Sequence, residues 1–144
     1  MIGEHVTNRT DQVTLEDAVG TLERLVDRYD SPAEIPAALQ QVRTALTRHC
    51  DAMEKTRDVF DEFILETPRL SHHVAELKIE HAAIRAMIDA LLDTFGGAPS
   101  VHHPALLVSL IGNARVLCEH IQRHHQHAAS VMHEAFVADT GWSD

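Results

Sequence analysis

Apolar residues recur every three or four positions in four separate stretches of the chain. In the first stretch they are spaced 4, 3, 4 and 3 residues apart, at Leu15, Val19, Leu22, Val26 and Tyr29. Such spacing places the apolar side chains on one face of an α-helix that packs against a core. The four stretches predict helices over approximately residues 14–29, 31–66, 70–95 and 104–138.

Residues that begin or end helices separate these stretches. Thr14 with Asp17 resembles a capping box, and Ser31 before Pro32 supplies an N-cap for the second helix. Thr67-Pro68 ends the second helix and Gly96-Gly97 ends the third. Short connections make consecutive helices antiparallel, so we predict an all-α protein, an up-down-up-down four-helix bundle. It spans residues 14–141, after a polar lead-in at residues 1–13.

Three of the predicted helices carry one histidine in an otherwise apolar stripe: His49, His81 and His124. A single histidine in such a position is usually explained by a hydrogen bond within the core. Antiparallel packing, however, brings all three within a few turns of one end of the bundle interior. Each buried imidazole without a partner would cost about 1–3 kcal/mol, and a metal ion would remove that cost. The pattern therefore predicts a metal site.

Carboxylates and further histidines lie near these positions. His120 precedes His124 by one helical turn, and the carboxylates that could bridge or complete a site are Glu54, Glu76, Glu80 and Glu119. Nitrogen and oxygen ligands without thiolates suit iron or manganese, with zinc as a further option. Off the stripe, His125, His127 and His133 are expected at the surface, and His72-His73 is expected to cap or be solvated at a helix end.

Charge and composition exclude several classes of partner. The 144 residues contain 12 Lys and Arg against 22 Asp and Glu, a formal net charge of -10. Binding to nucleic acid or to anionic membranes needs basic clusters, and the chain has none, so neither partner is expected. Without a leader sequence, a long apolar run or more than two cysteines, we expect a cytoplasmic protein. Nothing in the sequence predicts the oligomeric state.

The ligand-type residues follow a known arrangement. The second helix carries His49 and Glu54, the third carries Glu80-His81 within L-K-I-E-H-A-A-I-R, and the fourth carries His120 and His124. This arrangement resembles the hemerythrin-like, HHE cation-binding domain family. Two further motifs are similar to the family: E-T-P-R-L at 66–70, and H-E-A-F-V-A-D-T-G at 133–141, which is typical of an actinobacterial branch.

The resemblance implies a non-haem di-iron centre with an oxo or hydroxo bridge and bridging carboxylates. Members of this family carry or sense oxygen, handle nitric oxide or peroxide, or regulate iron. By position, the implied metal ligands are His49, Glu54, His81 and His124. We therefore expect a protein that binds or senses a small diatomic ligand or peroxide. The pattern leaves open whether it is an enzyme, although no substrate cleft or second catalytic motif is recognisable.

Three features depart from the family pattern. The usual glutamate four residues after the second-helix histidine is Met53, and no carboxylate follows His124 at Ala129 or Ser130. The first helix has no stripe histidine, unless His5 serves. Fewer ligands leave coordination positions open to small molecules, or reduce the site to one metal or none.

Two other functions are compatible with the same residues. An acidic, histidine-rich surface could store or sense iron, nickel or zinc through loose binding. Alternatively, the chain is a metal-free helical interaction domain in which the stripe histidines form only hydrogen bonds.

Overall fold

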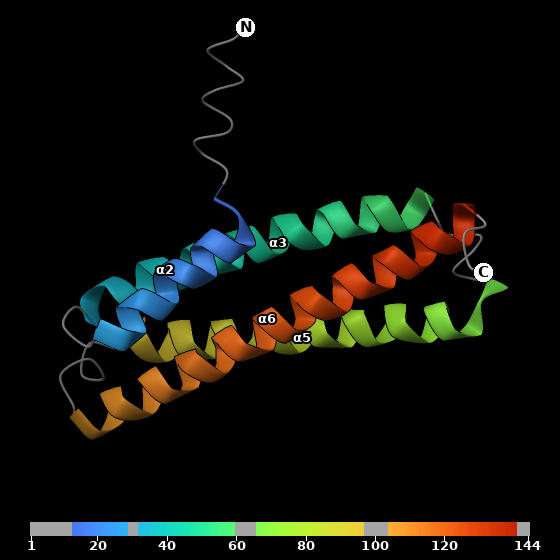
Figure 1. Cartoon of the computed structure of the whole chain (residues 1–144). Coiled ribbons are helices and arrows are strands. Elements are labelled where there is room, and N and C mark those ends of the chain that lie inside the picture. Colours follow the sequence, from blue (N-terminus) through green and yellow to red (C-terminus); the bar gives the residue numbers. More distant parts are fainter. Residues whose placement is uncertain (1–12, 29–31, 60–65, 97–103, 141–144) are drawn as a thin grey trace, which may run out of the picture.

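Four helices pack side by side in the computed structural model, which describes residues 13–28, 32–59, 66–96 and 104–140. In chain order the elements are α2 (Leu15–Arg28), the 3₁₀ turn η1 (Pro32–Glu34), α3 (Ile35–Val59), α5 (Pro68–Gly96) and α6 (Pro104–Thr140). Helices α2 and α5 each contact both α3 and α6. The chain runs up and down through these helices (Figure 1), which confirms the predicted up-down-up-down bundle.

Local sequence explains where two of the helices begin. The Oγ1 of Thr14 accepts a hydrogen bond of 3.1 Å from the backbone N–H of Asp17, so Thr14 is the predicted N-cap of α2. Pro68 opens α5, where the absent N–H of proline costs no hydrogen bond. The predicted N-cap Ser31 and the stretch through which the second helix was expected to continue, residues 60–65, lie outside the described residues, as do residues 1–12 and 141–144.

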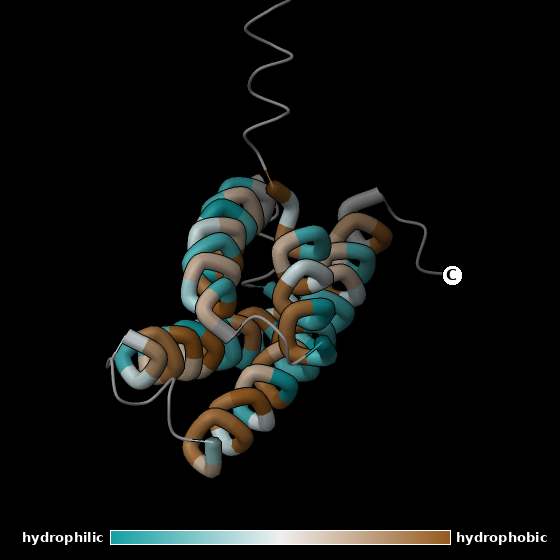
Figure 2. The backbone as a smooth tube through the Cα atoms, turned by 90° about the vertical axis from the view of Figure 1, so that its left-hand side faces the viewer, coloured by the Kyte–Doolittle hydropathy of each residue, from teal (hydrophilic) through white to brown (hydrophobic). Residues whose placement is uncertain are grey.

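The predicted apolar stripes form the core. Hydrophobic and hydrophilic segments alternate along the helices in Figure 2, as expected for amphipathic helices around a shared interior. Buried stripe residues include Leu22 and Val26 of α2, Leu39 of α3, Ile88 of α5 and Leu117 of α6. Among the described helices, none is long and apolar enough to cross a membrane.

The buried apolar residues of the described segments form two clusters. The larger one draws buried residues from all four helices. The smaller one contains Leu70, Leu77, Ala128, Val131 and Ala135 of α5 and α6, with Met53 of α3 packed against it. Helix α2 has only 14 residues and lies beside the N-terminal half of α3, so it does not reach the smaller cluster (Figure 1).

The stripe positions between the two clusters are His49, His81 and His124, here called the histidine layer. In α5, His81 lies one turn from Leu77 of the smaller cluster and one turn from Ile84 of the larger. The layer therefore lies a few helical turns from the start of α5. The three stripe histidines come together in the bundle interior, as antiparallel packing of the helices predicted.

Removing a large core side chain should destabilise the bundle strongly. Leu117 is fully buried in the larger cluster. Leu117→Ala should therefore lower the free energy of unfolding by about 2–5 kcal/mol, through lost burial and the cavity left behind. The neighbouring Val116 is 43% exposed, so Val116→Ala on the same helix is the matched control and should change stability by about 0.5 kcal/mol or less. Denaturant unfolding compares the two, and equal effects would contradict the assigned core.

Candidate metal centre

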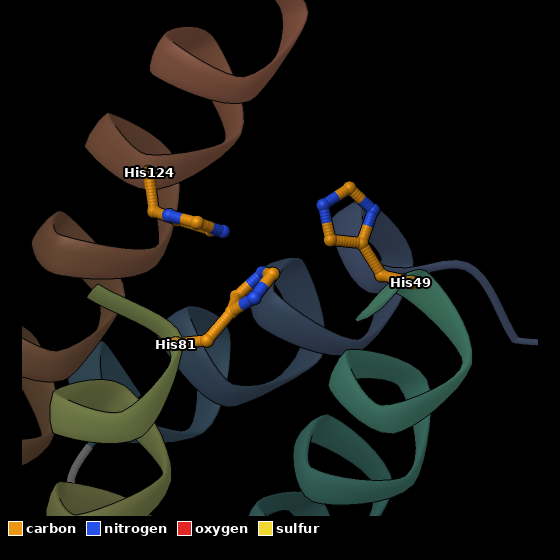
Figure 3. A group of neighbouring side chains, drawn as sticks. All are labelled: His49, His81 and His124. Carbon is orange, nitrogen blue, oxygen red and sulfur yellow. The ribbon is translucent and has the colours of Figure 1, made fainter. Parts of the chain in front are cut away.

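Side chains from three helices meet in the histidine layer, as Figure 3 shows. His49 belongs to α3, His81 to α5 and His124 to α6, and one ring nitrogen of each lies within 4.8 Å of the others. The ring centroids of His81 and His124 are 4.1 Å apart, and that of His49 lies 6.0 Å and 6.1 Å from them. The three imidazoles thus surround a common point inside the bundle.

The Nε2 atoms of these three histidines are buried and have no hydrogen-bond partner among the described residues. An unsatisfied buried polar atom costs about 1–3 kcal/mol, which is more than a bundle normally tolerates at three neighbouring positions. Coordination of a metal ion would remove this cost, because neutral imidazole is a common metal ligand. The residues therefore fit a transition-metal ion.

Glu80 fixes the orientation of one of these rings. Its Oε1 lies 2.7 Å from Nδ1 of His124, and its Oε2 lies 2.8 Å from Nδ1 of His127. Burial raises the pKa of this carboxyl, but its hydrogen bonds with His124 and His127 outweigh that effect and hold the pKa below its usual value. Because an ionised carboxylate only accepts, the Nδ1–H of His124 donates a hydrogen bond to Glu80. Its Nε2 lone pair then faces the layer, the arrangement usual around metal-bound histidines.

Burial keeps the other two rings neutral. Burial, together with the neighbouring His124 and His49, lowers the pKa of His81 from 6.5 to about 4. Burial, followed by repulsion from His124 and His125, also lowers the pKa of His49. A neutral imidazole has a free lone pair at pH 7, so both rings are in the form that binds a metal.

A small recess adjoins His81. It has a volume of about 40 Å³ and lies between α3, α5 and α6, with the apolar side chains of Met53, Val74, Leu77 and Met132 in its lining. A water molecule needs roughly 10–15 Å³, so the recess has room for a molecule of a few atoms. The layer is therefore next to a space for a small molecule.

The other residues predicted as ligands lie at the edges of the centre. Glu54 is exposed on α3 and borders the recess beside His81. His120 is exposed on α6 and borders a separate hollow between α5 and α6, together with Glu80. Neither residue belongs to the groups whose ligand atoms come together among the described residues. Their roles as ligands, and that of Glu80, stay predictions.

Two histidines assigned to the surface or to a helix end take part in a second cluster. His127 is half-buried, and its Nε2 lies 3.2 Å from Nδ1 of His73, also half-buried. Together with Glu76 they form a second group of ligand atoms within 4.8 Å of one another. The spacing of three residues from His73 to Glu76 places this pair on one face of α5, which the sequence could have indicated. The approach of His127 from α6 depends on how the two helices pack, which the sequence pattern does not give.

Another α6 histidine expected at the surface is also partly enclosed. His125 is half-buried, its ring centroid lies 5.7 Å from that of His49, and its Nε2 lies 3.2 Å from Glu16 of α2. Its buried Nδ1 has no partner among the described residues. His125 therefore flanks the layer on the side of α2.

Comparison with protein-family models, curated proteins and solved structures finds no significant match for this chain. The interpretation of the centre accordingly depends on its own residues and distances. These establish a four-helix bundle that holds histidine and glutamate clusters able to bind metal ions.

The metal-free protein should lose stability as the pH falls from about 6.5 to about 4. In this range the unfolded chain takes up a proton at His81, whereas the folded protein, with its pKa lowered to about 4, does not. The contribution of His81 to the free energy of unfolding is therefore fully present above pH 6.5 and is lost as the pH falls toward 4. Denaturant unfolding at several pH values should show a shallower dependence for His81→Asn than for the exposed control His133→Ala. Identical slopes would contradict the assignment.

Loss of the Glu80 carboxylate should weaken metal binding without removing a histidine. In Glu80→Ala, Nδ1 of His124 loses its acceptor, and the ring no longer presents Nε2 in a fixed orientation. Loss of such a partner typically lowers metal affinity by about 10- to 100-fold. Competition with a chelator for Zn²⁺ measures the affinity of the protein for its most tightly bound ion, before and after the substitution. Glu119→Ala, an exposed glutamate on α6, is the control and should match the wild type.

Proposed function

We propose that the protein is a non-haem iron protein of the hemerythrin-like type. In this proposal His49, His81 and His124 hold an iron ion that binds dioxygen, nitric oxide or peroxide. The observation that supports it most is the convergence of three buried Nε2 atoms without partners, one from each of three helices. A bundle selected only for stability would carry apolar residues at these stripe positions.

The donor set favours a metal that accepts nitrogen ligands. Neither cysteine offers a thiolate: burial raises the pKa of Cys118 to about 12, and it also raises the pKa of Cys50. Imidazole ligands suit iron, copper, nickel and zinc. The choice of iron rests on the resemblance of the ligand-type residues, such as Glu80-His81, to the hemerythrin-like family.

Open coordination and the size of the recess favour a small ligand. Three protein ligands leave positions free on a transition metal, where iron would supply reversible binding of a small molecule. The recess of about 40 Å³ beside His81 has room for a diatomic molecule or peroxide. We therefore favour binding or sensing over catalysis on a larger molecule.

The positions of the carboxylates bear on the number of irons. A bridged di-iron centre, which the resemblance implies, needs carboxylate oxygens that are free to bridge. Both oxygens of Glu80 are hydrogen-bonded to histidines, and Glu54 is exposed. Three imidazoles without a carboxylate suit one ion, so we propose one iron in the layer, with the di-iron form as the alternative if Glu54 turns inward.

Iron content of the protein purified without an affinity tag tests this function. His81→Ala and His124→Ala should each reduce bound iron by at least about tenfold, because losing a direct ligand costs more than losing its hydrogen-bond partner. Elemental analysis gives irons per chain, and near-ultraviolet absorption reports an oxo-bridged pair. Circular dichroism checks that the variants fold.

Two further variants act as comparisons. His133→Ala removes an exposed histidine from α6 and should keep all its iron. Glu54→Ala separates the two forms, since it should leave a single-iron layer unchanged but reduce a di-iron centre. Full iron content in both His81→Ala and His124→Ala would rule out the layer as the iron site.

A further inference from the structure

We propose a second metal site on the face between α5 and α6, formed by His73, Glu76 and His127, for a divalent transition-metal ion of the zinc type. One ligand atom from each of these residues lies within 4.8 Å of the other two. The three residues are distinct from those of the histidine layer. Two histidines and a glutamate are a known donor set for zinc, and the same types of ligand bind ferrous iron.

The two imidazoles already have the spacing of shared ligands. Nε2 of His127 lies 3.2 Å from Nδ1 of His73. Two nitrogens bound to one zinc at about 2.0–2.1 Å with a tetrahedral angle are about 3.3 Å apart. Glu76 follows His73 by three residues on α5, and its Oε1 lies 3.8 Å from the same Nδ1. Small side-chain rotations would therefore bring all three atoms onto one ion.

Neighbouring groups orient two of the three ligands. Nδ1 of His127 donates to Oε2 of Glu80 at 2.8 Å, so its Nε2 carries the lone pair that faces His73. This is the carboxylate–histidine pairing found behind many metal ligands. Oε1 of Glu76 lies 2.7 Å from Nε2 of the exposed His72, which holds the glutamate beside the cluster.

This cluster differs from the histidine layer in its access to solvent. The side chains of His73, Glu76 and His127 are 29%, 41% and 23% exposed, whereas that of His124 is 1% exposed. A fourth coordination position would therefore be filled by water. An ion could enter and leave this site without opening the bundle.

The two sites can be altered independently. His73 and His81 are eight residues apart on α5, about 12 Å along the helix axis, so one ion cannot bind both. Glu80 contacts a histidine of each site and is the residue that connects them. Variants of His73 or Glu76 leave every residue of the layer in place.

Zinc titration of the metal-free full-length protein tests the second site. Native mass spectrometry should give two zinc ions per wild-type chain, one in each site. His73→Ala and Glu76→Gln should each lower the affinity for one of these two zinc ions by at least tenfold. His133→Ala should bind zinc as the wild type does. His81→Ala should keep the ion held by His73, and this result would support the second site even if the layer bound no metal.

The metal-free alternative is a hydrogen bond between the two rings, which also accounts for a separation of 3.2 Å. That alternative gives the same zinc affinity and stoichiometry for His73→Ala, Glu76→Gln and the wild type, and such a result would overturn the proposal. Agreement between the two variants guards against a folding defect in either one. A wild type that binds the His73-dependent ion but no ion that depends on His81 would count against the proposed function alone.

Discussion

The constraint on which the rest of this bundle depends is a layer of three imidazole rings, one buried and two half-buried, between two apolar clusters. The unpartnered Nε2 atoms of His49, His81 and His124 each cost about 1–3 kcal/mol, against a total stability of about 5–15 kcal/mol for a domain of this kind. Such a layer persists only if something else compensates for it. In the proposed function, the compensation is a metal ion, because the same lone pairs that are costly without a partner are strong ligands.

Glu80 shows how a single side chain can prepare more than one position. Its two oxygens meet Nδ1 atoms of two different α6 histidines, so both rings direct Nε2 away from the carboxylate. Sequence reasoning predicted this residue as a ligand, whereas the structure places its oxygens in hydrogen bonds to His124 and His127. A carboxylate in this position controls the tautomer and the orientation of both rings.

Much of the fold and the centre of the site were predictable because helix periodicity is a local property. Residues such as Leu22, Ile88 and Leu117 are buried where the stripes placed them, and His124 occupies a stripe position at 1% exposure. The pairing of His73 with His127 was not predicted, because it depends on the rotation and register of α5 against α6. Periodicity within one helix carries no information about either quantity, so contacts between polar side chains on different helices require the folded structure.

The short α2 has a consequence for how the protein opens. Four helices enclose the larger cluster, whereas α3, α5 and α6 are the described helices that contribute to the smaller one, and the histidine layer separates the two. Packing is poorly transmitted across a layer of unsatisfied polar atoms, so we expect the three-helix end to open as its own cooperative unit in the metal-free protein. An ion bound to three helices would join the two units, and amide hydrogen exchange along α6 would then slow at both ends together. Metal binding at the layer would in that case couple the opening of the two ends of the bundle.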